Sequence, residues 1–291
     1  MSKKTLTVEV KPEILKWAID TAGWKEEDIS KKLKVSPAIF SSWLKGVANP
    51  TLNQLEDLAK VVKRPLAVFF LPEAPKENPL PKDYRMLPEK TGKFDKKTIL
   101  AIRRARRLQK ISKELSENLN ANINKMIPTV KKSEDPKKTA EKYREEFKLD
   151  DKKQKSFKNP YEVFNYLRDI IEEKNIIIFQ ISMPIEDARG FTLVDGSPAV
   201  IVVNSKDQIE ARIFTLMHEF GHVLLNESGV SMPENSLFIK NVESVEKWCN
   251  DFSSAFLLPE ALAKAEFSQN KDVAKLSRAY KVSKAMLFYN M

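Results

Sequence analysis

The residues best suited to chemistry form one short cluster, His218-Glu219-Phe220-Gly221-His222, which contains both histidines of the chain. Histidines four residues apart on an α-helix differ by only about 40° in direction, so both imidazoles can bind one metal ion. Glu219 is offset toward the open side of that ion, where its carboxylate can take a proton from an acidified water molecule and pass it to a leaving amine. The spacing therefore predicts metal-assisted hydrolysis, with zinc as the metal.

A catalytic zinc ion needs a third protein ligand, and here it cannot be a histidine because both are already used. The candidates are carboxylates on the next amphipathic segment, Glu243, Glu246 and Asp251. Glu246 shares a helical face with Asn250, so it can turn inward with Asn250 as a supporting partner, whereas the other two acids suit a surface. Cys249 is a soft ligand suited to zinc, but a single cysteine beside Trp248 is expected in the core. We predict Glu246 as the third ligand, in a site that would also accept manganese.

The histidine cluster needs a helix, and apolar residues recur at helical spacing through it: Ile213, Phe214, Met217, Phe220 and Leu224. Ser205 and Gln208 predict a capping box at the start of this helix. The preceding β-branched runs 176–179 and 199–203 predict strands, with 189–194 between them and Asp195-Gly196 as a hairpin turn. We expect a small antiparallel sheet that covers the helix, preceded by helices near 137–147 and 160–173.

The rest of the chain divides by composition. Five short helical patterns in residues 12–72 predict an all-α domain over 1–75, and prolines mark a linker after it. A basic helix at about 95–125 completes a connecting region over 76–136, and a domain of mixed helix and strand fills 137–291. The predicted fold class is mainly α with a small antiparallel sheet, α+β.

The net charge of +10 lies in the middle of the chain. Residues 76–158 carry 25 basic and 13 acidic side chains, whereas 159–291 carry 13 and 18. The basic helix could therefore lie against nucleic acid phosphates, although a charge run is more often a solvated face. No apolar leader begins the chain and no stretch is long and apolar enough for a membrane span, so we expect a cytoplasmic protein without membrane contact.

Several phrases together resemble the ImmA/IrrE family of metallopeptidases. They are Arg189-Gly190-Phe191-Thr192, Phe214-Thr215-Leu216-Met217-His218-Glu219-Phe220-Gly221-His222, Glu246-Lys247-Trp248-Cys249-Asn250-Asp251-Phe252, Phe256-Leu257-Leu258-Pro259 and Tyr280-Lys281-Val282-Ser283. The resemblance implies a zincin-like domain with His218, His222 and Glu246 as zinc ligands and Glu219 as general base. It also implies cleavage of a helix-turn-helix repressor in response to stress. The family usually continues into a further helix with an Arg-Leu pair, where this sequence has Leu287-Phe288-Tyr289-Asn290-Met291, so a truncated C-terminus is one interpretation.

Hydrolysis of a peptide also needs a donor to the developing oxyanion, commonly histidine or tyrosine. Because both histidines are used, the donor would be a tyrosine, and Tyr280 is one candidate, although a tyrosine in a C-terminal helix is more often a packing residue. An extended substrate could add to a sheet edge near Gly190-Phe191-Thr192, as peptides do at exposed strands.

The segment from Asp28 to Gly46 resembles the helix-turn-helix of the XRE/Cro repressor class, with Ser36 as the cap and Pro37 in the first turn of the recognition helix. The residues expected to face nucleic acid are Pro37, Ala38, Ser41, Ser42 and Lys45. The four that would face bases lack the Arg, Lys, Asn or Gln side chains that make bidentate base contacts. DNA and a protein partner are therefore equally good predictions for this helix.

The leading hypothesis is a zinc endopeptidase that acts on a regulatory partner protein, a helix-turn-helix repressor, in a stress, phage or toxin-antitoxin response. The alternative is a DNA-binding transcriptional regulator whose zinc domain senses or scaffolds without proteolysis, and a third is an antitoxin-like binding module. Glu219 favours the enzyme because a purely structural zinc site does not need it. The sequence leaves open a homodimer, the substrate and the activating signal.

Overall fold

The computed structural model describes residues 6–84, 93–119, 129–232 and 244–290. The chain forms two compact units, one of Met1–Pro79 with Phe94–Leu100 and one of Leu80–Lys93 with Ala101–Met291. Each unit has its own cluster of buried apolar side chains. No helix in the described ranges is long and apolar enough to cross a membrane.

The N-terminal unit confirms the five predicted helical segments. They are α1 (Pro12–Asp20), α2 (Glu26–Leu33), α3 (Pro37–Leu44), α4 (Leu52–Val62) and the 3-10 helix η1 (Leu66–Phe70). The predicted cap is also confirmed, because the Ser36 hydroxyl accepts a hydrogen bond from the Ile39 amide and Pro37 begins α3. Phe40 and Trp43 turn the opposite side of α3 into the core, with ring centroids 5.6 Å apart.

The C-terminal unit contains a five-stranded sheet in the order β1-β5-β3-β4-β2. The strands are β1 (Lys82–Asp83), β2 (Ile176–Ile181), β3 (Gly190–Leu193), β4 (Ala199–Asn204) and β5 (Gly229–Ser231). β3 is antiparallel to both of its neighbours, β4 and β5, whereas β2 is parallel to β4 and β1 is parallel to β5. The predicted α+β class is confirmed, but the sheet is mixed instead of wholly antiparallel.

The mixed directions arise from the connection between β2 and β3, residues 182–189. This connection carries the chain past the position that β4 later fills. After β3 the chain reverses at the predicted turn, and β4 then lies between β2 and β3. The Asn204 side chain holds the connection, since its amide donates to the carbonyls of Met183 and Ala188 and its oxygen accepts from the Met183 amide. Strand composition indicates where strands lie but not the direction in which they pair.

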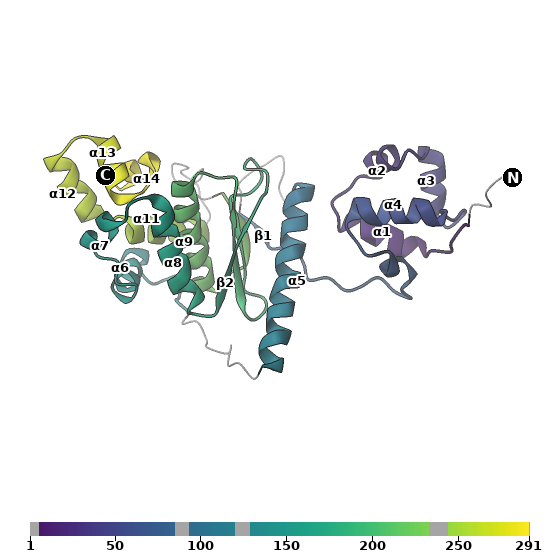
Figure 1. The fold of residues 1–291 in the computed structure, drawn as a ribbon, viewed down its shortest axis with the longest axis horizontal. Coiled ribbons are helices and arrows are strands. Elements are labelled where there is room, and N and C mark those ends of the chain that lie inside the picture. Colours follow the sequence, from purple (N-terminus) through teal and green to yellow (C-terminus); the bar gives the residue numbers. More distant parts are fainter. Residues whose placement is uncertain (1–5, 85–92, 120–128, 233–243, 291) are drawn as a thin grey trace. The chain divides into compact units, whose positions relative to one another are not determined.

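Helices cover both faces of the sheet (Figure 1). On one side lie α8 (Pro160–Glu172) and α9 (Ile209–Leu225), and on the other lies α5 (Lys96–Asn118), whose residues from Ala101 onward belong to this unit. Gln109 of α5 donates to the Pro198 carbonyl at 2.8 Å. Every residue of β4 is buried as a result, which explains a β-branched run without polar alternation.

The remaining helices extend the face that carries α9. They are α6 (Pro136–Glu146), α7 (Asp151–Ser156), α11 (Ser244–Leu257), α12 (Glu260–Gln269), α13 (Val273–Tyr280) and α14 (Lys284–Tyr289). The predicted helices at 137–147 and 160–173 are confirmed as α6 and α8, and the predicted 95–125 helix is confirmed as α5 over its described residues. The predicted capping box is wrong, because α9 begins at Ile209 with Gln208 as its N-cap and no side-chain cap, and the Ser205 amide donates to Ile181.

Candidate metal centre

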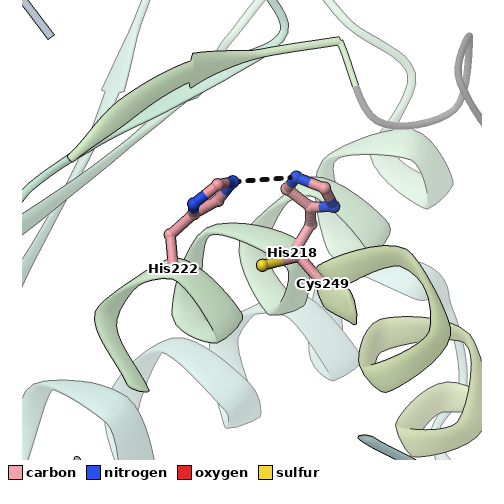
Figure 2. A group of neighbouring side chains, drawn as sticks. All are labelled: His218, His222 and Cys249. Carbon is pink, nitrogen blue, oxygen red and sulfur yellow. Dashed lines mark hydrogen bonds between the residues drawn. The ribbon is translucent and has the colours of Figure 1, made fainter. Parts of the chain in front are cut away.

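The two histidines of α9 point toward each other from successive turns (Figure 2). Their Nε2 atoms lie 3.2 Å apart, and both side chains are completely buried. The apolar residues around them belong to the core that α9 shares with the sheet and α11, including Phe214, Met217 and Phe220. The helical period therefore places both imidazoles on one face, and the sheet and α11 remove that face from water.

Glu246 of α11 completes the group of potential ligands. One of its carboxylate oxygens lies 2.8 Å from His222 Nε2 and the other 3.4 Å from His218 Nε2. Burial alone would raise the pKa of this carboxyl group, but the two histidines outweigh burial and lower it to about 2. Glu246 is therefore an anion held against two imidazole nitrogens.

The hydroxyl of Ser231, on β5, reaches the same atoms. It lies 3.2 Å from a Glu246 oxygen, to which it donates, and 3.3 Å from His222 Nε2. Ser231 is fully buried, so its hydroxyl does not contact bulk water. β5 therefore contributes a neutral hydroxyl donor to a site that otherwise consists of imidazole and carboxylate groups.

These residues fit a zinc ion. Zinc binds imidazole nitrogen at about 2.0–2.1 Å in tetrahedral geometry, which places two ligand nitrogens about 3.3 Å apart. The observed 3.2 Å between the Nε2 atoms agrees with that separation. The second oxygen of Glu246 is buried without a hydrogen bond in the described structure, which is the condition that a cation would relieve.

Cys249 also lies beside the histidines, one turn after Glu246 on α11. Its sulfur and one nitrogen of each histidine lie within 4.8 Å of one another. In Figure 2 the sulfur lies to one side of the line that joins the facing nitrogens. A Cβ atom at Gly221 would come within 3.2 Å of this sulfur, so Cys249 fills the place where α11 crosses α9. Burial, together with the nearby Glu246 and Glu219, raises the pKa of the Cys249 thiol well above its usual value and keeps it protonated.

Glu219 lies under β3, on the same helix as the histidines. The Thr192 hydroxyl donates to its carboxylate at 2.6 Å, and a Cβ atom at Gly190 would come within 2.9 Å of its other oxygen. Burial raises the pKa of Glu219 to about 7, while His222 and the Thr192 hydrogen bond act in the lowering direction. A carboxyl group with this pKa can both accept and release a proton near neutral pH.

Thr192 is therefore expected to act as a positioning residue for Glu219. Thr192→Val should lower kcat/KM for peptide hydrolysis by about 10- to 100-fold, because a hydrogen bond to a charged group contributes about 1.5–3 kcal/mol. The acidic limb of the pH–rate profile should move to higher pH, since loss of this donor raises the pKa of Glu219. Thr192→Ser keeps the hydroxyl and should restore most of the rate. An unshifted profile in Thr192→Val would show that Thr192 only packs.

The described contacts of Tyr280 and Asp251 are with residues outside this centre. The Tyr280 backbone carbonyl accepts from Gln154, and its ring lies 4.9 Å from Lys155 Nζ, so its polar contacts in the described structure are with the α7 helix. Asp251 is half-buried, not on the surface as expected, and its carboxylate accepts hydrogen bonds from Tyr289 and Lys247. Glu243 lies outside the described residues. The role of Tyr280 as an oxyanion donor stays a prediction.

The predicted substrate edge also changes. β3, which carries Gly190-Phe191-Thr192, lies between β5 and β4, so it has no free edge.

The residues predicted to face nucleic acid lie on or next to α3 in the N-terminal unit: Pro37, Ala38, Ser41, Ser42 and Lys45. Pro37, Ala38 and Lys45 are exposed, and Ser41 and Ser42 are half-buried.

Sequence reasoning did not find Ser231 or Tyr84. Ser231 ends a three-residue strand and belongs to no motif. Tyr84 lies far from the histidines in the sequence, but its ring centroid is 5.3 Å from that of His222. Only strand pairing brings these two residues to the site, and the sequence gives no local signal of that pairing.

A buried histidine pair with an adjacent glutamate on the same helix is the arrangement of a metallopeptidase-type domain. Comparison with protein families agrees, because residues 171–291 match the peptidase M78 family, described as the IrrE N-terminal-like domain. The match begins in α8 and includes α9, Glu246 and the strands β2 to β5. A search of curated proteins finds no match to this chain.

Proposed function

We propose that the chain is a zinc endopeptidase that cleaves a regulatory partner protein, a helix-turn-helix repressor in a stress, phage or toxin-antitoxin response. The observation that carries this proposal is the position of Glu219, which is buried beside the histidine pair with a pKa of about 7. A site that only holds zinc for structure or sensing does not need a buried carboxyl group with a raised pKa beside the three ligands.

Each residue has a distinct role in this proposal. His218, His222 and Glu246 hold the ion, and Thr192 orients Glu219, which accepts a proton from the attacking water and delivers it to the leaving amide nitrogen. The Ser231 hydroxyl keeps the Glu246 carboxylate turned toward the histidines. Zinc, when bound, supplies a Lewis acid that polarises the peptide carbonyl and acidifies water.

We propose Glu246 rather than Cys249 as the third ligand, because the oxygens of Glu246 lie 2.8 and 3.4 Å from the histidine nitrogens and its pKa is low. Glu246→Ala should weaken zinc binding by more than about 100-fold, the upper range for loss of an outer partner. Cys249→Ala, one turn away on the same helix, should keep about one zinc per chain. Competition with a chromophoric zinc chelator measures both affinities. If Cys249→Ala weakened zinc binding more than Glu246→Ala, the Cys249 thiolate would be the third ligand.

The endopeptidase activity can be tested without knowledge of the substrate. The zinc-loaded protein is incubated with a peptide library from proteome digests and with purified helix-turn-helix repressors, and new termini are mapped by mass spectrometry. Internal cleavage that disappears after chelation and returns with zinc would support the proposal. Intact peptides and repressors at full zinc occupancy would favour the non-proteolytic regulator. A repressor substrate would place the reaction in the cytoplasm.

We propose that α3 recognises a protein partner. Its exposed surface includes Pro37, Ala38 and Ile39, and Ile39 is 51% exposed, whereas Lys45 is the cation that follows the helix. An exposed apolar residue among small ones suits a protein surface better than the phosphates and base edges of DNA. Binding of DNA by the same helix remains the alternative, to be distinguished by gel-shift assays with Lys45→Ala and Ile39→Ser variants.

A further inference from the structure

A short stretch of the chain's own backbone lies along the sheet next to the histidines. We call residues 80–84, Leu80-Pro81-Lys82-Asp83-Tyr84, the edge segment. Its strand β1 pairs in parallel with β5, with Lys82 opposite Gly229 and Asp83 opposite Val230. The Tyr84 amide then donates to the Val230 carbonyl at 3.0 Å. The edge segment is therefore bound as an added strand.

The side chain of Tyr84 reaches into the candidate metal centre. Its ring centroid lies 5.3 Å from that of His222 at an interplanar angle of 30°, and the residue is only 2% exposed. The Tyr84 hydroxyl donates to Glu227 at 3.4 Å, just beyond the end of α9. Tyr84 thus occupies a pocket in which the imidazole ligand forms one wall.

Gly229 also contacts the Tyr84 ring. A Cβ atom at this position would lie 2.3 Å from Tyr84 Cδ2 and 2.4 Å from Cε2, so any other residue would exclude the ring. Thr192 stands opposite Gly229 in the β3–β5 register, which places the pocket on the sheet face that contacts Glu219. An aromatic ring fits between Gly229 and His222, directly beside the proposed catalytic residues.

The edge segment lies where an extended peptide could add to β5 as a strand. Peptides bind exposed strands through backbone hydrogen bonds, and pockets for alternate side chains give specificity. β5 carries Ser231, which contacts His222 and Glu246, so a strand added to β5 runs past the metal centre. With the edge segment in place, the side chains of the centre are fully buried: His218, Glu219, His222 and Glu246.

We propose that the β5 edge and the pocket between Gly229 and His222 form a binding subsite for an extended peptide with an aromatic side chain, and that the edge segment occupies this subsite in cis. The proposal rests on the proposed peptidase function and adds to it the substrate class and a competitor built into the chain. A substrate segment must displace Tyr84 before it can lie along β5.

The test uses full-length, zinc-loaded protein and a direct binding readout. Tyr84→Pro removes both the ring and the amide that donates to Val230, whereas Tyr84→Phe retains both and serves as the matched control. The probe is a fluorescein-labelled Leu-Pro-Lys-Asp-Tyr peptide, followed by fluorescence anisotropy, and its counterpart ends in alanine. Circular dichroism and zinc content establish that each variant is folded and loaded.

The tyrosine peptide should bind Tyr84→Pro at least tenfold more tightly than it binds wild type or Tyr84→Phe, and the alanine peptide should lose that gain. Equal binding to all three proteins, or equal binding of both peptides, would overturn the subsite. If Tyr84→Pro does not fold, Tyr84→Ala is tested for chelator-driven zinc loss, which should be at least tenfold faster than in wild type. An unchanged rate would show that Tyr84 does not cover the centre. Peptide binding without hydrolysis by any variant would instead count against the peptidase function.

Discussion

Glu219→Gln should reduce kcat for peptide hydrolysis by about 10²- to 10⁴-fold, the range supplied by a positioned general base. Glutamine has nearly the same shape and can still accept the Thr192 hydrogen bond, so the fold and the zinc site should persist. The amide has no pKa in this range and cannot take the proton from water. Initial rates on a cleaved peptide, at matched zinc content, measure the effect.

Glu210→Gln is the matched control for Glu219→Gln. Glu210 lies in the first turn of the same helix and is half-buried, but the described structure gives it no contact with the histidines. This variant should keep nearly full activity. Comparable rates for Glu219→Gln and wild type would remove Glu219 from the reaction and with it the main support for a peptidase.

Zinc should stabilise the C-terminal unit by about 4 kcal/mol when its free concentration is 1,000-fold above the dissociation constant. The physical reason is that the ion binds the folded arrangement of His218, His222 and Glu246, which the unfolded chain does not hold together. In His222→Ala this stabilisation should vanish. Amide hydrogen exchange of α9, with and without chelator, reports the local free energy of opening.

The stability prediction has an internal control. Added zinc should restore the protection of α9 in the chelated wild type, whereas His222→Ala should show no response to zinc below micromolar concentrations. If zinc protects α9 equally in both proteins, the ion binds elsewhere and the histidine pair is only a packing contact.

Features set by nearby residues could be predicted from the sequence. The cap of α3 at Ser36 and the strands around the Asp195-Gly196 turn follow from residues within a few positions of each other. The approach of His218 and His222 follows from the helical period alone. The failed capping box shows the limit of such signals, because the turn before α9 is stabilised instead by the Asn204 side chain, which accepts from the Lys206 amide, and by the Asp207 side chain, which accepts from the Gln208 amide.

Features set by pairing across the chain could not be predicted in the same way. β2 and β4 have the same β-branched character whether they run parallel or antiparallel, so the direction depends on the length and bonding of the connection through Met183. Tyr84 reaches His222 only because β1 adds to β5, two short strands separated by most of the unit's sequence. Cys249 is a further example. The sequence predicts a core residue, but the packing of α11 on α9 also brings its sulfur close to the histidine nitrogens.

X-ray absorption at the zinc edge, on the full-length protein loaded with zinc, tests the central claim most directly. The account predicts about one zinc per chain, with nitrogen and oxygen neighbours at about 2.0–2.2 Å from His218, His222 and Glu246, and the same spectrum in Cys249→Ala. A sulfur neighbour at about 2.3 Å that disappears in Cys249→Ala would contradict the proposed ligand set. Failure of the wild type to retain zinc at all would contradict the metallopeptidase centre itself.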